Sequence, residues 1–134
     1  MSLDVTSLGN AVRRLREGFE RHKREPTDEQ IRDGLIRRLE FTYELTHKML
    51  KRYLKETAAS PDEIERMPFA DLVRSGNAQG LLRSDWPAWR RFLEMRARTS
   101  HTYDNKVASQ VAATIPVFLD EAEYLYAELQ RRLA

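Results

Sequence analysis

Cysteine is absent from this 134-residue chain, and histidine occurs only three times. The missing thiols exclude disulfide bonds, cysteine nucleophiles and thiolate-bound zinc or iron–sulfur centres. His22, His47 and His101 show none of the spacings of metal-binding motifs, and the acidic residues form no calcium-loop pattern. We therefore expect no metal site and no cofactor.

Long apolar runs are also missing, and the excess of positive charge is small. No stretch approaches the roughly 18 apolar residues of a transmembrane helix, and the N-terminus lacks the apolar core of a signal peptide. We therefore expect a cytoplasmic protein without membrane association. Lysine and arginine number 23 and aspartate and glutamate 21, so the net charge is only +2. This balance argues against a broad basic surface for duplex DNA, although it permits a local basic patch.

What the chain does contain is helical periodicity, in a composition of 41% hydrophobic and 33% charged residues. Apolar residues recur every three or four positions at about residues 4–24, 28–55 and 105–132, which is the spacing of amphipathic helices. A fourth helix is predicted to begin at Ser84-Asp85-Trp86-Pro87, where capping residues precede a first-turn proline. Residues 61–83 are interpreted as one or two short helices in a long connection.

These patterns predict an all-α fold, because no segment shows the sustained two-residue alternation of a strand. The expected architecture is an antiparallel four-helix bundle with an extra short helical connection. It forms a single domain over residues 4–133. Pro116 lies inside the last helix and is predicted to kink it near residues 112–115.

The segment RARTSHTY, residues 96–103, carries the strongest functional pattern, because it combines an arginine, a histidine and a tyrosine. Arginine binds phosphate oxygens through a planar fork of donors, and histidine transfers protons near neutral pH. In a continuous helix, His101 lies about 140° around the axis from Arg96, so the two side chains cannot meet. They converge only if the helix ends near Ser100 or if a second chain completes the site. Otherwise the trio, including Tyr103, is a solvated helix face.

Two segments of the chain resemble one known family. Residues 38–54 include the run FTYEL at 41–45 and are similar to the FEFTYEL-xx-K-xL-K-xxL helix of nucleotidyltransferase substrate-binding proteins. Residues 96–103 are similar to that family's R-N-x-T-S-H-T-Y segment. Ser60-Pro61 and the apolar stretch at 69–73 resemble its connecting helix. The resemblance extends over roughly residues 5–130.

The resemblance implies a helical bundle of the HEPN superfamily that works beside a small, separately encoded minimal nucleotidyltransferase. Some such pairs are toxin–antitoxin systems, in which the HEPN chain is a metal-independent ribonuclease with a composite site at a homodimer interface. In some of them the transferase silences the toxin by adenylylating the motif tyrosine. Carried onto this chain, Arg96 and His101 would be the ribonuclease pair and Tyr103 the adenylyl acceptor. Ala97 stands where the superfamily usually has asparagine or another polar residue, which puts the ribonuclease activity in doubt.

Two functions therefore stay open. In the first, the chain is a non-catalytic subunit that presents a substrate, or itself, to the transferase. In the second, it is a ribonuclease toxin that acts on RNA. A helical interaction module without chemistry is a weaker third interpretation.

Several other residues have both a structural and a functional interpretation. Glu40, Glu44 and Lys48 are spaced four apart, which favours ion pairs along one helix, but the acids would also suit a cleft for the partner. Trp86 and Trp89 favour packing over base stacking.

Arg98, with Arg90 and Arg91, would either hold an RNA backbone or only solvate its helix. The candidate site thus has Arg96 and His101 as the catalytic pair. The residues assigned to modification or binding are Tyr103, Arg98, Ser100, Glu40 and Glu44.

Overall fold

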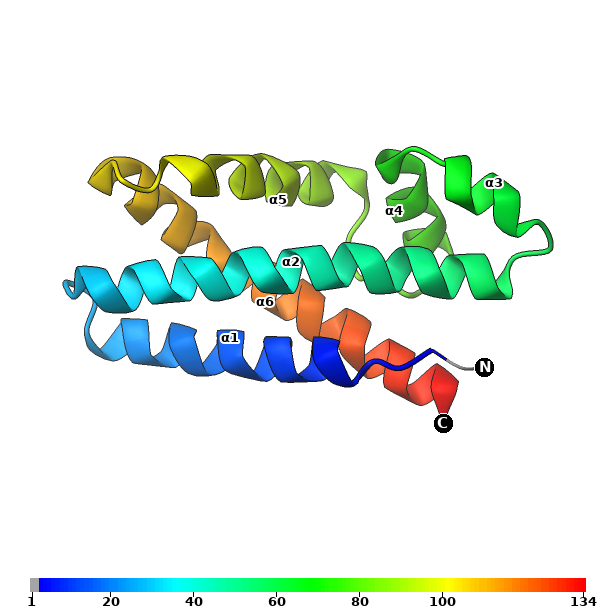
Figure 1. Ribbon diagram of the computed structural model, residues 1–134, viewed down its shortest axis with the longest axis horizontal. Coiled ribbons are helices and arrows are strands. Elements are labelled where there is room, and N and C mark those ends of the chain that lie inside the picture. The colour runs from blue at the N-terminus through cyan, green and yellow to red at the C-terminus, as the bar shows by residue number, and fades with distance from the viewer. Residues whose placement is uncertain (1–2) are drawn as a thin grey trace.

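The computed structural model describes residues 3–134, and all regular structure within them is helical. Figure 1 shows α1 (Thr6–Arg24) and α2 (Glu29–Thr57) side by side and antiparallel, with α6 (Asn105–Leu133) crossing behind them and α5 (Trp86–Arg98) along the upper side. The connection between α2 and α5 contains α3 (Pro61–Arg66) and α4 (Phe69–Ala78), which pack on α2. The predicted all-α bundle with a short helical connection is confirmed.

The helix boundaries follow local capping chemistry. The carboxylates of Asp28, Asp85 and Asp104 accept backbone N–H groups at the starts of α2, α5 and α6, at 3.0, 2.7 and 2.8 Å. Each bond satisfies a donor that the first helical turn leaves without a partner. The last helix continues through Pro116 without interruption, so the predicted kink does not divide α6.

A hydrophobic core runs along the bundle and is richest in aromatic rings around α5. Trp89 and Phe118 are fully buried, with ring centroids 6.2 Å apart and nearly perpendicular planes. Phe92 lies edge-on to both rings, with each pair of centroids 5.3 Å apart. The predicted packing role of Trp89 is therefore confirmed, and its burial leaves no face on which a nucleic acid base could stack.

A buried carboxylate ties the beginning of α5 to α6. The indole N–H of Trp89 donates to Oε1 of Glu121 at 2.9 Å, and the backbone N–H of Ser84 donates to the same oxygen at 3.0 Å. Glu121 is itself buried on α6. Because a buried acceptor needs donors, this arrangement determines how α5 sits on the bundle.

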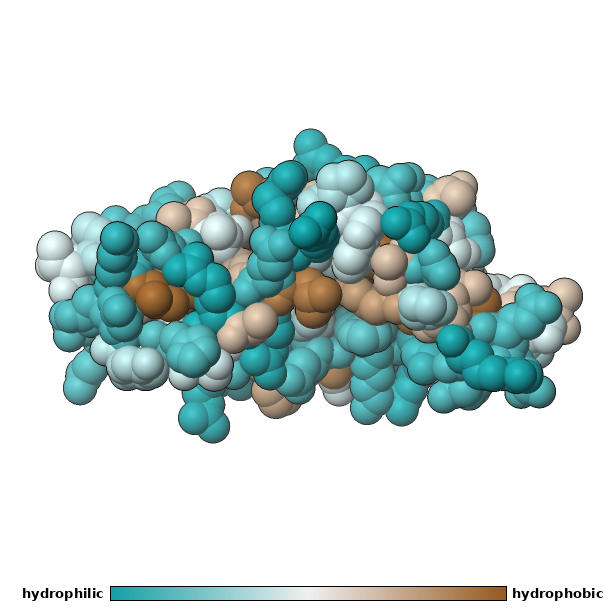
Figure 2. All heavy atoms as spheres, turned by 90° about the horizontal axis from the view of Figure 1, so that it is seen from above, coloured by the Kyte–Doolittle hydropathy of each residue, from teal (hydrophilic) through white to brown (hydrophobic). Residues whose placement is uncertain are grey.

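The outer face of α5, α4 and α3 is mostly hydrophilic, and its hydrophobic patches are small and separate, as Figure 2 shows. Over the described chain, the large hydrophobic side chains that remain exposed are Phe41, Leu93, Tyr103 and Val117. Within residues 3–134, no helix combines the length and the apolar character that crossing a bilayer requires.

Candidate functional site

Arg96 lies in the last turn of α5, where its guanidinium reaches across to α2. Nη2 donates to Oε1 of Glu44 at 2.7 Å, and Nη1 lies 3.7 Å from Oε2 of Glu40. Nη1 also donates to the hydroxyl of Thr99 at 3.0 Å. The Arg96 side chain is 29% exposed. An arginine with this many partners is held in one orientation, and a phosphate that approaches it competes with the two carboxylates for the guanidinium.

Glu40 and Glu44 therefore have a different partner from the one predicted. The expected ion pairing with Lys48 along α2 is wrong, because both acids face Arg96, which is 52 residues further along the chain from Glu44. Residues four apart on a helix lie on the same face, so both carboxylates reach one guanidinium when α5 packs beside α2. Their alternative role in a cleft for a partner stays a prediction.

The helix that carries the motif ends close to Ser100, which was one of the two alternatives that the sequence left open. α5 stops at Arg98, and a 3-10 turn, η1 (Thr99–His101), leads toward α6. The hydroxyl of Ser100 donates to the carbonyl of Ala97 at 3.2 Å, and that of Thr102 to the carbonyl of Thr99 at 3.1 Å. These short-range bonds compete with helix continuation and close the turn. In this structure the hydroxyl of Ser100 thus stabilises the turn.

His101 and Tyr103 project from this turn into solvent. Their ring centroids are 6.2 Å apart with planes at 68°, and Tyr103 is 85% exposed. Arg96 points instead toward α2, and its hydrogen bonds and ion pairs within the described chain go to Glu40, Glu44 and Thr99 and not to His101. One chain therefore brings His101 and Tyr103 together, while Arg96 bonds to α2 and to Thr99.

Two of the three arginines around the motif, Arg98 and Arg90, contact other side chains of this chain. Arg98 donates to the side-chain oxygen of Gln110 on α6, which links the two sides of the turn. Arg90 pairs with Glu94 at 3.3 Å on its own helix, whereas Arg91 is exposed. A role for these arginines on RNA stays a prediction.

Three residues near the site escaped the sequence analysis as functional candidates. Thr99 is buried and holds Arg96, and Gln110 holds Arg98. Tyr43 is buried beside Arg96, and its hydroxyl has no hydrogen-bond partner among the described residues. Burial raises the pKa of Tyr43 to about 12, and the positive charge of Arg96 opposes part of that rise. Tyr43 and Thr99 both belong to the segments that resemble the family, which was the available signal.

No group of three or more His, Cys, Asp or Glu residues in the described chain is arranged to hold a metal ion. The polar groups of the candidate site are the guanidinium of Arg96, the imidazole of His101, the phenol of Tyr103 and the two carboxylates that pair with Arg96. Such groups bind phosphate and move protons.

The packing of His47 predicts that the folded protein loses stability in mild acid. Its ring packs on Phe69 with centroids 4.1 Å apart, and burial, followed by repulsion from Lys51, lowers the pKa of His47. The unfolded chain therefore takes up a proton at a higher pH than the folded protein. The stabilisation is complete above about pH 6.5 and is lost as the pH falls through that value toward the folded pKa.

We expect the free energy of unfolding, measured by urea denaturation from pH 8 to pH 5, to fall less steeply in His47→Gln than in the wild type. Parallel curves for the two proteins would remove His47 as the source of the acid sensitivity.

Comparison with known proteins shows which family this chain resembles. The chain matches the family model described as "Nucleotidyltransferase substrate binding protein like" over residues 3–131. It is 40% identical over 99 residues to a Haemophilus influenzae protein named "Probable ribonuclease HepT", and the match covers 74% of this chain and 67% of that protein.

The fold is similar to that of HI0074 from Haemophilus influenzae, whose structure was described as revealing the fold of a substrate-binding domain of a nucleotidyltransferase. The TM-score is 0.89 at 31% sequence identity, and the match covers 95% of this chain and 99% of the other. The family model spans almost the whole chain and the fold agrees with it, so the resemblance found in residues 38–54 and 96–103 is confirmed. The chain belongs to the nucleotidyltransferase substrate-binding protein family.

Proposed function

We propose that this chain is the substrate-binding partner of a separately encoded minimal nucleotidyltransferase and that it presents Tyr103 to that enzyme, within a two-gene pair of the toxin–antitoxin kind. The observation that supports this most directly is the 85% exposure of Tyr103 at the tip of a turn. A phenol in that position reaches into another protein's active site without any unfolding of the bundle. The engagement of Arg96 by Glu40 and Glu44 favours the same function, because two carboxylates lie where a ribonuclease would place a phosphate.

The proposed reaction transfers an adenylyl group from ATP bound to the transferase. The phenolic oxygen of Tyr103 attacks the α-phosphorus, a new phosphorus–oxygen bond forms, and the bond to pyrophosphate breaks. The phenolic proton leaves to a base on the transferase or to His101, whose ring lies beside that of Tyr103. The products are adenylyl-Tyr103 and pyrophosphate.

The test is co-purification of the chain with the transferase, followed by incubation with ATP and magnesium and by peptide mass spectrometry. We expect a stable complex and an adenylyl group on the peptide that contains Tyr103, and no modification in Tyr103→Phe. Tyr124→Phe is the matched control, because the Tyr124 hydroxyl is occupied by a bond of 3.2 Å to the carbonyl of Gly80. An active transferase that binds the chain but leaves Tyr103 unmodified would sink this proposal.

A second candidate, a metal-independent ribonuclease, is favoured by the helix end at Arg98 and the exposure of His101. It also agrees with the name of the relative, "Probable ribonuclease HepT". Here a two-fold axis would bring Arg96 of one copy to His101 of another. His101 would take the proton of a ribose 2′-hydroxyl while that oxygen attacks the phosphorus. The bond from phosphorus to the 5′-oxygen would break, and that oxygen would take a proton from water, giving a cyclic 2′,3′-phosphate and a free 5′-hydroxyl. Arg96 would exchange Glu44 for the phosphate.

A further inference from the structure

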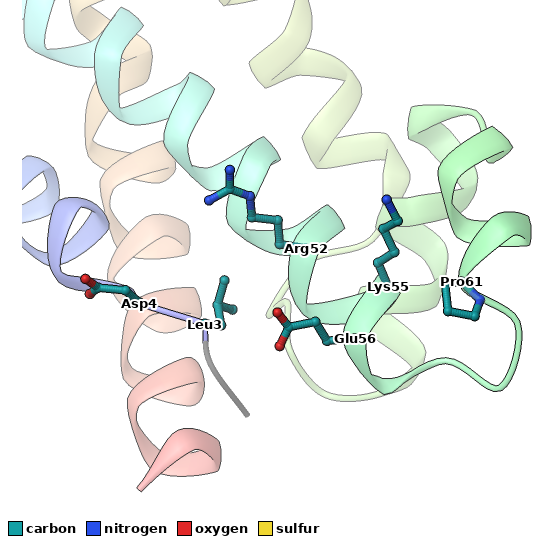
Figure 3. A pocket seen from close by; sticks show the side chains of 6 residues that line it. All are labelled: Leu3, Asp4, Arg52, Lys55, Glu56 and Pro61. Carbon is teal, nitrogen blue, oxygen red and sulfur yellow. The ribbon is translucent and has the colours of Figure 1, made fainter.

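Two hollows on the surface of the described chain differ sharply in charge. The first lies where the N-terminal segment meets the end of α2 and the start of α3, with a volume of about 580 Å³. Figure 3 shows its four charged side chains, which are Asp4, Arg52, Lys55 and Glu56. Two acids balance two bases there, and Lys55 is already 2.8 Å from Glu65. This hollow favours no anion, and we assign it no ligand.

The second hollow is a groove of about 580 Å³ between α1 and α2. Its lining includes three arginines, Arg14, Arg37 and Arg38, and no acidic residue. Three positive charges in one groove exceed the net charge of +2 carried by the whole chain. The groove is therefore the local basic patch that the overall charge balance permitted, and it shares no residue with the cluster around Arg96.

Three acidic residues close to this groove in the sequence form ion pairs with arginines outside it. Glu17 pairs with Arg13 at 3.7 Å, Asp33 with Arg32 at 3.2 Å, and Glu40 with Arg96 at 3.7 Å. By contrast, no carboxylate in the described chain forms an ion pair with any of the three groove arginines. Clustered guanidinium groups without counter-ions repel one another, so an anion that binds between them gains both attraction and relief of that repulsion.

The groove also contains an aromatic ring and one oriented guanidinium. Phe41 is 66% exposed on α2 at the groove's edge. Arg38 is held across the gap between the helices, because its Nη1 donates to the backbone carbonyl of Arg14 at 2.7 Å. Asn10 adds an amide with both a donor and an acceptor. A flat exposed ring next to phosphate-binding groups is the combination that binds a base and its phosphate together.

Gly34 has no side chain that would narrow this groove, although packing within the chain does not require a glycine at this position. A methyl group added at Gly34 would meet no heavy atom within 4 Å, and a glycine inside a helix is less stable than an alanine. Its place on the groove wall leaves room for a ligand to approach the backbone of α2.

From these observations we propose that the α1–α2 groove is a binding site for a phosphorylated nucleotide unit, with the base on Phe41 and the phosphates on Arg14, Arg37 and Arg38. The nucleotide comes either from a free nucleoside triphosphate or from a single-stranded RNA. The volume suits one such unit, since ligand pockets of this kind measure about 300–1,000 Å³. The assignment does not depend on Arg96, His101 or Tyr103.

The test uses the full chain with three probes: ATP, inorganic phosphate, and a labelled single-stranded RNA hexamer with 2′-O-methyl groups. The methylated hexamer cannot be cleaved through a 2′-hydroxyl, so its binding is independent of any ribonuclease activity. We expect Arg14→Gln and Arg37→Gln each to weaken binding of ATP or the hexamer about tenfold. For the hexamer, the affinity of each variant should also fall less steeply with salt: the negative slope of log affinity against log salt should become shallower by about 0.7.

Arg13→Gln is the matched control, because it removes the same charge from the neighbouring position but outside the groove. Phe41→Ala should weaken binding about tenfold through lost stacking. Gly34→Leu should weaken it by filling the groove while the melting temperature does not fall, since a Cβ at this position meets no heavy atom within 4 Å and leucine favours the helix more than glycine does. Binding of ATP alone identifies a free nucleotide, and binding of the hexamer alone identifies an RNA strand.

Three results would overturn the proposal. The wild type binds neither ATP nor the hexamer, or Arg13→Gln weakens binding as much as Arg14→Gln. In the third, phosphate binds as tightly as ATP and Phe41→Ala has no effect, which leaves only a general anion patch.

Discussion

Replacement of His101 by alanine is expected to lower RNA cleavage by the purified chain by about 10²- to 10⁴-fold, the size typical of losing a general acid or base. This prediction follows from the ribonuclease candidate, in which the exposed imidazole of His101 accepts or donates the proton at the scissile bond. The measurement is cleavage of a labelled RNA in excess chelator, with a 2′-deoxy substrate as the chemical control.

The two variants of the motif allow a sharper test when they are mixed. Arg96→Ala and His101→Ala should each be inactive alone. If the site combines Arg96 of one copy with His101 of the other, an equal mixture should regain about a quarter of the wild-type activity, because about half of the dimers carry one intact site of two. A site contained in one chain would regain none.

Equal cleavage by the wild type and His101→Ala would identify a contaminating nuclease. No cleavage by either, with both proteins folded and dimeric, would reject the ribonuclease candidate for this chain and implicate Ala97. The proposed role as a presenter of Tyr103 to the transferase would then stand by itself, because that role does not require His101 to act on RNA.

Trp89→Ala is expected to lower the free energy of unfolding by about 3–5 kcal/mol. Trp89 is fully buried and lies edge-on to Phe92, Phe118 and Phe69, with centroids 5.3, 6.2 and 6.2 Å away. Its removal leaves a cavity and also deprives the buried Glu121 of one of its two donors, which adds to the cost. A loss of this size is a large fraction of the stability of an ordinary domain.

The measurement for Trp89 is urea denaturation followed by circular dichroism. Trp86→Ala is the control, because Trp86 is half-buried and lies at the outer edge of the same cluster, 6.0 Å from Phe69. Trp89→Phe keeps much of the ring but leaves Glu121 short of a donor, so it should lie between the wild type and Trp89→Ala. Equal effects of the Trp86 and Trp89 substitutions to alanine would contradict the assigned role of the buried tryptophan.

The helices themselves were predictable, because the signals that begin and end them are local. Asp28, Asp85 and Asp104 each lie at a predicted helix start and cap it. The end of α5 was one of two alternatives that the spacing of Arg96 and His101 left open. The structure ends α5 at Arg98, with hydroxyl-to-carbonyl bonds around η1 that also act over only three residues, and the completion of the site by a second chain stays a prediction.

The partners of the charged residues were less predictable than the helices. Glu44 had Lys48 within reach on its own helix, and such a pair contributes only about 0.2–0.5 kcal/mol. Arg96, presented from the neighbouring helix, instead offers a fork of N–H donors that both Glu40 and Glu44 reach. The three arginines of the groove likewise lie in two separate stretches, and their convergence required the antiparallel packing of α1 on α2.

By itself, the sequence determined the helical class, the starts of the main helices, the family and the order of the motif's side chains, because periodicity, capping and motif spacing act within a few residues. Only the tertiary structure decided that Arg96 binds Glu40 and Glu44, that Tyr103 stands exposed beside His101, and that Trp89 is buried on Glu121. These contacts join residues 30 or more positions apart, or depend on which face of a helix meets a neighbour. Their geometry is set by the packing of the whole core, which no local pattern encodes.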